Sequence, residues 1–95
     1  MLFYYTVYAK VDCGYCATAV NKLNQYDLDH VLVLVDKSMD FYSHLKKKYN
    51  HQTVPMIVKS SKVNGEDVEF IGGCDDFIQY LNCLLYTSDA ADDLT

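Results

Sequence analysis

The sequence predicts a single α/β domain whose elements follow the order βαβαββα. Residues 3 to 9, FYYTVYA, are aromatic and β-branched, which is typical of a strand buried on both faces, and VLVLV at residues 31 to 35 is a second continuous apolar run. Between them, apolar residues recur at helical spacing from residue 14 to about residue 26. An Asn-Gly turn signal at residues 64 and 65 separates two later apolar runs. The 95 residues suffice for one hydrophobic core.

Two helices are predicted, one before and one after the second strand in the sequence. In the first helix, Val20 and Leu23 share an apolar face, and the polar stretch DLDH ends the helix. The second helix is expected at about residues 39 to 49, where Asp36 or Ser38 can cap its N-terminus. Its apolar residues lie on one side and its lysines largely on the other, so we expect one side to face the sheet.

The second half of the chain predicts a β-hairpin followed by a helix. TVPMIV at residues 53 to 58 is expected to form the third strand, entered through Pro55, and DVEFI at residues 67 to 71 the fourth. Gly72 and Gly73 then interrupt the strand. The following CDDFIQYL begins a helix with acidic residues in its first turn, where the helix dipole favours them.

Composition excludes several classes of partner. Eight Lys against thirteen Asp and Glu give a formal net charge of -5, so the chain lacks the basic excess that nucleic acids or anionic membranes attract. The opening MLFYYTVYAK lacks the features of a signal peptide, and no apolar run is long enough to span a bilayer. We therefore expect a cytoplasmic protein, in a compartment where a CxxC motif is typically catalytic or metal-binding.

The motif CGYC places Cys13 and Cys16 at the start of the first predicted helix. A thiolate is the nucleophile in disulfide exchange, and the unpaired N–H groups of a helix N-terminus stabilise it, so we expect Cys13 to attack and Cys16 to resolve. A zinc site would need two more ligands, and the remaining cysteines, Cys74 and Cys83, are far away in the sequence. We interpret the three histidines, His30, His44 and His51, as single surface or loop residues.

Several motifs together resemble the glutaredoxin family. CGYC after YAKVD, then TVP, then IGGCDDF follow the family's order and spacing over residues 3 to about 82. The Tyr within the CxxC motif and the GGCDD segment resemble glutaredoxins rather than thioredoxins. This resemblance implies a thioredoxin-like fold, with a four-stranded mixed sheet flanked by three helices. It also implies a glutathione-dependent enzyme that reduces glutathione mixed disulfides and protein disulfides.

The resemblance also assigns a glutathione site. Lys10 matches a lysine that meets a glutathione carboxylate, and Tyr15 matches a tyrosine that packs on the bound tripeptide. The assigned residues are Lys10, Tyr15, Thr53, Val54, Pro55, Gly73, Cys74, Asp75 and Asp76. The family further implies a cis peptide bond before Pro55. From the residues alone, a buried small side chain is the simpler interpretation of Cys74.

The chain departs from the family pattern at three places. Gly14 stands where many dithiol members have Pro. In this respect the chain resembles members with a small residue there, which implies, as an alternative, a [2Fe-2S] cluster bridging two subunits through each Cys13. We otherwise expect a monomer, and a dedicated electron donor to ribonucleotide reductase is a further alternative. Asp12 stands where Thr is common and could cap the helix. Tyr42 lies near the usual Gln or Arg of the second helix, and the lysines at residues 46 to 48 are interpreted as a solvated face.

The end of the chain differs from the rest. CLLYTSDAADDLT, residues 83 to 95, shows no apolar period. One reading frame of a transposase-based sequencing adapter translates as CLLYTSDAAD, the sequence of residues 83 to 92. We therefore assign residues 1 to 82 to the glutaredoxin-like domain and interpret residues 83 to 95 as a non-native, translated adapter, in which Cys83 has no function.

Overall fold

Strand β1 (Phe3–Ala9) lies at the centre of the sheet in this computed structural model, which describes residues 2 to 94 and the side chains of residues 2 to 84. The sheet has the order β2-β1-β3-β4, with β2 (His30–Leu34), β3 (Met56–Ser61) and β4 (Asp67–Gly72). β1 is parallel to β2 and antiparallel to β3, and β3 and β4 form an antiparallel pair. The predicted mixed four-stranded sheet is thereby confirmed.

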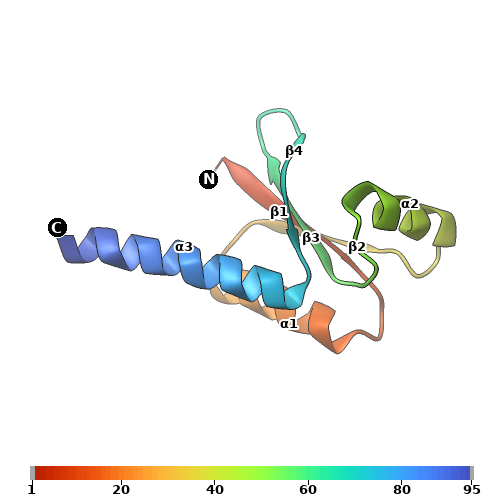
Figure 1. Cartoon of the computed structure of the whole chain (residues 1–95), viewed down its shortest axis with the longest axis horizontal. Coiled ribbons are helices and arrows are strands. Elements are labelled where there is room, and N and C mark those ends of the chain that lie inside the picture. Colours follow the sequence, from red (N-terminus) through yellow and green to blue (C-terminus); the bar gives the residue numbers. More distant parts are fainter. Residues whose placement is uncertain (1, 95) are drawn as a thin grey trace.

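Three helices cover the two faces of this sheet. They are α1 (Gly14–Gln25), α2 (Met39–Tyr49) and α3 (Cys74–Leu94). α1 and α3 lie together on one face, whereas α2 lies on the other (Figure 1). The element order βαβαββα agrees with the prediction from the sequence.

Alternate side chains of β1 build the larger core. Tyr5, Val7 and Ala9 are buried against α1 and α3, where Leu23 and Phe77 are fully buried as well. The intervening β1 residues are half-buried, because the opposite face is covered by the smaller cluster around α2. The strand is therefore covered on both faces, but only one face is fully buried, so the expectation of a strand buried on both faces holds in part.

Strand β2 is far less buried than its apolar sequence predicts. Val31, Leu32 and Leu34 are 50%, 49% and 51% exposed, whereas Val35, just beyond the strand, is fully buried. The physical reason is position, since β2 is an edge strand with β1 on only one side. A continuous apolar run does not distinguish a central strand from an edge strand.

The third strand begins later than predicted. Residues 53 to 55 precede β3, which starts at Met56 opposite Tyr8 of β1. Proline has no N–H for a strand ladder, so pairing begins after Pro55. The Val54–Pro55 peptide bond is cis, as the family resemblance implied.

The predicted Asn-Gly turn is present, whereas the predicted side-chain cap of α2 is not formed. Gly65 has a φ of 72°, and Asn64 Oδ1 accepts a hydrogen bond from the N–H of Glu66 at 3.0 Å, as expected for this turn. Ser38 is the N-cap of α2, but its side chain makes no capping hydrogen bond. Asp36 instead accepts a hydrogen bond from the N–H of Val11 at 3.2 Å. It therefore holds the loop after β1 rather than the helix.

Helix α3 continues past the boundary that the sequence suggested. Its backbone is helical from Cys74 to Leu94, so no break in the helix marks residue 82. The side chains of residues 85 to 95 lie outside the described part of the chain, and the adapter origin of the tail stays a prediction. Among the residues that are described, no helix is long and apolar enough to cross a membrane.

A polar cluster joins α2 to β4. The hydroxyl of Tyr49 donates to Asp67 Oδ2 at 2.5 Å, and Lys48 Nζ lies 3.3 Å from the same oxygen. The Tyr49 ring also stacks on Phe70, with ring centroids 4.6 Å apart. The hydrogen bond from Tyr49, together with Lys48, lowers the pKa of the Asp67 carboxyl. The charged form of Asp67 therefore stabilises the folded state.

We predict that Tyr49→Phe lowers the free energy of unfolding by about 1 kcal/mol near neutral pH, a value reduced for the partial exposure of Asp67. Because the pKa of Asp67 is lowered on folding, its contribution exists above the unfolded value of about 4 and is lost as the pH falls through the folded value. The difference between variant and parent, measured by urea unfolding, should therefore shrink as the pH is lowered below the unfolded pKa of Asp67. Tyr4→Phe is the control, and an equal loss in both variants at all pH values would contradict the prediction.

Candidate functional site

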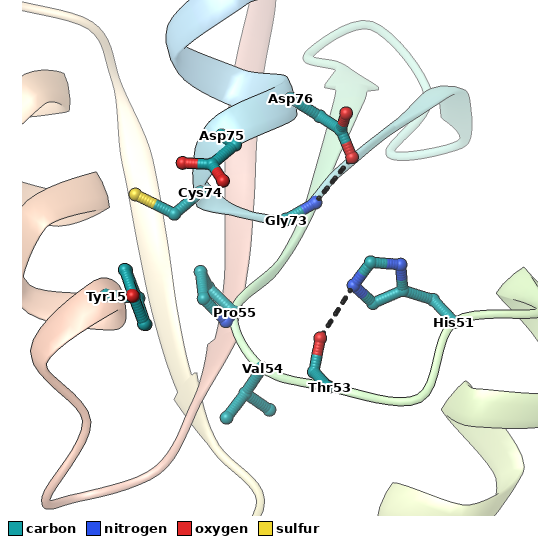
Figure 2. Close-up of a pocket in the computed structure, with 9 residues that line it drawn as sticks. All are labelled: Tyr15, His51, Thr53, Val54, Pro55, Gly73, Cys74, Asp75 and Asp76. Atoms are coloured by element: carbon teal, nitrogen blue, oxygen red, sulfur yellow. Dashed lines mark hydrogen bonds between the residues drawn. The ribbon is translucent and has the colours of Figure 1, made fainter.

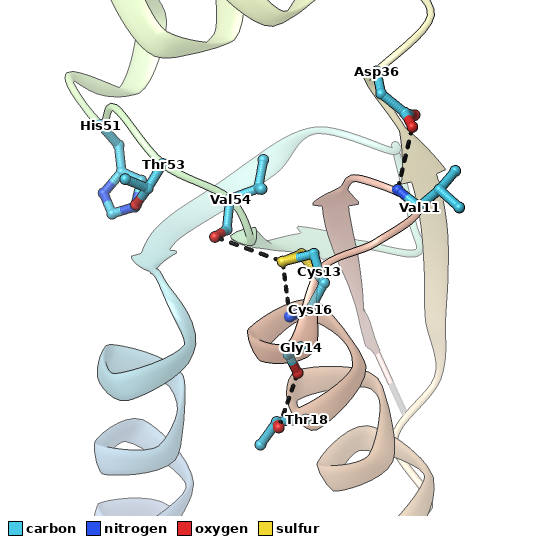
Figure 3. Close-up of a disulfide and its surroundings, with 9 residues drawn as sticks. All are labelled: Val11, Cys13, Gly14, Cys16, Thr18, Asp36, His51, Thr53 and Val54. Atoms are coloured by element: carbon cyan, nitrogen blue, oxygen red, sulfur yellow. Dashed lines mark hydrogen bonds between the residues drawn. A yellow bond between two sulfur atoms is a disulfide. The ribbon is translucent and has the colours of Figure 1, made fainter.

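The two cysteines lie at the start of α1, just after the loop that follows β1. Cys13 is the N-cap of α1, with φ −131° and ψ 108°, and its Sγ accepts a hydrogen bond from the N–H of Cys16 at 3.2 Å. A disulfide joins the two residues, whose Cα atoms are 5.2 Å apart (Figure 3). The spacing of three residues brings the second sulfur one turn along the helix, back to the first. The N-cap is thus Cys13 and not Asp12, which corrects one expectation from the sequence.

The two sulfurs differ in accessibility. Cys16 is only 4% exposed, whereas Cys13 is half-buried and lies at the end of the helix. The Cys13 Sγ also lies 4.0 Å from the backbone oxygen of Val54, in the loop before β3. When the pair is reduced, an incoming disulfide can reach Cys13 more readily, and the helix N-terminus can stabilise its thiolate.

A polar cavity of about 340 Å³ lies next to this pair. It is formed by the first turn of α1, the loop before β3 and the N-terminus of α3 (Figure 2). The residues that line it are Tyr15, His51, Thr53, Val54, Pro55, Gly73, Cys74, Asp75 and Asp76. Side chains from three separate parts of the sequence therefore meet in one place.

Eight of the nine residues that the sequence assigned to glutathione line this cavity, and Lys10 is the exception because it lines a neighbouring groove beside Cys13 and Cys16. Lys10 Nζ lies 4.8 Å from the centroid of the Tyr42 ring, and Lys46 Nζ lies 4.6 Å from the same centroid. Tyr42 is buried, and its hydroxyl donates to the backbone oxygen of Gln52 at 3.3 Å. Lys46 is therefore not simply part of a solvated face, because it shares an aromatic ring with Lys10.

His51 is a residue of the cavity that sequence reasoning missed. Its Nε2 lies 3.2 Å from the Thr53 hydroxyl, and its ring meets Phe70 edge-on at 5.5 Å between centroids. Figure 2 shows the imidazole on the side of the cavity opposite Tyr15. Its position just before the TVP motif was the available signal, but a single histidine in a loop has no spacing that predicts a site.

The N-terminus of α3 needs a glycine before it. Gly72 has a φ of 123°, and a Cβ at this position would lie 2.4 Å from Asp76 Oδ2. That oxygen accepts a hydrogen bond from the N–H of Gly73 at 3.3 Å. The close approach lets the Asp76 carboxylate face the backbone at the helix start, where the dipole favours negative charge.

Cys74 lines the cavity without taking part in the disulfide. It is 6% exposed, in agreement with a buried small residue, and in Figure 2 its sulfur lies on the Tyr15 side of the cavity, away from His51. Burial, followed by the charge of Asp75, raises the pKa of the Cys74 thiol. Cys74 is therefore a poor nucleophile at neutral pH. Within the described residues, no three His, Cys, Asp or Glu side chains gather to hold a metal ion.

A family profile and several solved structures relate this chain to glutaredoxins. The Glutaredoxin family profile matches residues 5–68. Among solved structures, a wheat glutaredoxin is 25% identical with a TM-score of 0.67, covering 82% of this chain and 70% of its own. A dithiolic glutaredoxin of Trypanosoma brucei brucei is 33% identical with a TM-score of 0.61, covering 76% of this chain and 70% of its own.

Two further solved structures extend the comparison. Reduced glutaredoxin C1 of Populus tremula x tremuloides is 29% identical with a TM-score of 0.64, covering 85% of this chain and 68% of its own. A thioredoxin-like protein is 26% identical with a TM-score of 0.56, covering 85% of this chain and 97% of its own. No curated protein matches the chain significantly. The fold is thus thioredoxin-like, as the sequence resemblance implied.

We predict that Asp12→Thr increases the rate at which iodoacetamide alkylates Cys13 near neutral pH by about two- to fivefold. Two like charges about 4 Å apart in water repel by about 1 kcal/mol, so removing the carboxylate favours the thiolate. The rate is followed by peptide mass spectrometry in a Cys16→Ser background, where Cys13 stays reduced. Asp40→Thr, on the first turn of α2, is the control. An unchanged or slower rate for Asp12→Thr would refute the electrostatic explanation.

Proposed function

Since this chain belongs to the glutaredoxin family, we propose that it is a glutathione-dependent oxidoreductase that reduces glutathione mixed disulfides and protein disulfides. Family and fold make it a thiol-disulfide oxidoreductase, and the dependence on glutathione is our inference. Its main support is the polar cavity beside Cys13, in which eight of the assigned glutathione residues meet.

The first reaction is exchange on a glutathione mixed disulfide. The Cys13 thiolate attacks the glutathione sulfur, so that a bond forms between Cys13 and glutathione while the protein sulfur leaves as a thiolate and takes up a proton. A second glutathione thiolate then attacks the same glutathione sulfur. It releases oxidised glutathione and regenerates the Cys13 thiolate. One free glutathione and the glutathionyl group of the substrate thereby become one disulfide, and the protein sulfur is reduced to a thiol.

Reduction of a protein disulfide uses the second cysteine. Cys13 forms a mixed disulfide with one substrate sulfur, and the other substrate sulfur leaves as a thiol. The Cys16 thiolate then attacks the Cys13 sulfur, which releases the reduced substrate and forms the Cys13–Cys16 disulfide. Two glutathione molecules reduce this disulfide again. The low exposure of Cys16 suits this role, because Cys16 needs to reach only its neighbour one helical turn away.

The polar cavity offers groups that complement glutathione, which has two carboxylates and one ammonium group. In our proposal, the N-terminus of α3 receives the γ-glutamyl carboxylate and the side chain of Asp76 receives the ammonium. The backbone of Val54 pairs with the cysteinyl part, close to Cys13. Lys10 and Lys46, which share the Tyr42 ring, attract the glycyl carboxylate.

We predict that Cys13→Ser abolishes turnover of every disulfide substrate, because it removes the nucleophile. Cys16→Ser should retain turnover of the mixed disulfide of glutathione and β-mercaptoethanol but lose reduction of protein disulfides. Both reactions are followed with glutathione, glutathione reductase and NADPH. Residual activity in Cys13→Ser would overturn the assignment. If the parent itself is inactive and becomes coloured after anaerobic reconstitution, the iron-sulfur alternative replaces it.

We predict that Lys10→Gln and Lys46→Gln each raise the KM for the same small mixed disulfide about two- to fivefold. An exposed ion pair contributes up to about 1 kcal/mol, which corresponds to this range. Lys47→Gln is the matched control, because Lys47 is an exposed neighbour on the same helix. A similar KM in all three variants would show that the glycyl carboxylate is held elsewhere.

A further inference from the structure

A second groove, of about 370 Å³, adjoins the cysteines and shares no residue with the polar cavity. Both Cys13 and Cys16 line it, whereas neither lines the polar cavity. Its other walls come from the end of β1, the outer side of α1 and strand β2. Aliphatic side chains dominate these walls, namely Val11, Ala17, Val20, Leu32 and Leu34.

The groove is apolar surface that the domain leaves uncovered. Leu32 and Leu34 are 49% and 51% exposed, and Val11 is 64% exposed. Pairing of Val7 with Leu32 and of Ala9 with Leu34 places both leucines on the sheet face that carries α1. Figure 3 shows Val11 held beside the end of β2 by the hydrogen bond to Asp36. Leu32 and Leu34 thus lie on a strand paired with β1, and Val11 lies on a loop that is hydrogen-bonded to Asp36.

Strand β2 also presents free backbone groups along this groove. The backbone oxygen of Asp29 accepts from Tyr5 at 2.9 Å, and the N–H of Val35 donates to Ala9 at 2.8 Å. Alternation along a strand then turns the backbone groups of Leu32 and Leu34 away from β1. In the described part of the chain, no strand pairs with β2 on that side. Another extended segment can add there as a fifth strand.

We propose that this groove and the outer edge of β2 bind an extended, apolar segment of the protein disulfide substrate, next to its reactive cysteine. The inference rests on the proposed function and names the class of substrate for the same cysteines. Glutathione, with its three charges, suits the polar cavity, whereas apolar side chains beside a β-edge suit a polypeptide. The cysteines at the groove place the substrate disulfide at the end of the bound segment.

A transient substrate explains the groove better than a permanent partner does. A second copy of this chain paired along β2 would cover the groove that both cysteines line. Disulfide exchange requires that their sulfurs become accessible again in every cycle. The occupant must therefore leave with each turnover, as a substrate does.

The test uses two peptides that each contain one internal disulfide and differ only in three residues beside the first cysteine, which are Val in one and Ser in the other. The parent should reduce the Val peptide with a kcat/KM at least about tenfold above that of the Ser peptide. In the double variant Leu32→Thr, Leu34→Thr, this preference should disappear, while turnover of the glutathione–β-mercaptoethanol mixed disulfide stays within about twofold. Val68→Thr, on the opposite edge strand β4, is the matched control and should keep the preference.

Other outcomes separate the two proposals. A preference that persists in the double variant, or that is absent in the parent, would overturn the groove as a docking site. A parent without activity on the small mixed disulfide would instead overturn the proposed function. A parent that is a dimer in light scattering, and that the double variant converts to a monomer, would assign the groove to a second copy. If the double variant fails to fold, Leu32→Thr alone should still reduce the preference.

Discussion

The burial of alternate side chains on β1 is the constraint on which the other elements depend. Tyr5, Val7 and Ala9 must be covered on one face, so α1 and α3 lie side by side there and both begin near the same end of the sheet (Figure 1). The antiparallel register that pairs Tyr8 with Met56 brings the Val54–Pro55 loop to the end of β1. Because of the packing of this one strand, two helix N-termini and one loop lie around the cysteines.

This arrangement brings together the groups that favour a thiolate, the reactive form in thiol exchange. Cys13 lies at the N-terminus of α1, where the dipole and the N–H of Cys16 favour a thiolate. The N-terminus of α3 offers a second region of positive potential, balanced by Asp75 and Asp76 in its first turn. Cys74 is the first residue of α3, but its burial and the charge of Asp75 raise its pKa, so the thiol does not compete with Cys13.

The two cavities beside the cysteines differ in chemistry, and we propose that one receives glutathione and the other a segment of the protein disulfide substrate. The polar cavity presents hydrogen-bonding and charged groups that complement a charged tripeptide. The apolar groove presents leucines and an open strand edge that complement a polypeptide. An edge strand is usually protected against pairing with other chains. The exposed leucines of β2 depart from that rule, and they line the same groove as Cys13 and Cys16.

By itself, the sequence determined the order of the elements and the position of the cysteine pair at the start of α1. Local signals sufficed, because the CGYC spacing, the Asn-Gly turn and the apolar periods each act within a few residues. Tertiary structure alone decided that β2 is an exposed edge, that His51 lines the polar cavity and that Lys10 lies beside Lys46 on the Tyr42 ring. These outcomes depend on which elements become neighbours in space. Strand order and helix placement come from burial of the whole core, and no short stretch of sequence encodes them.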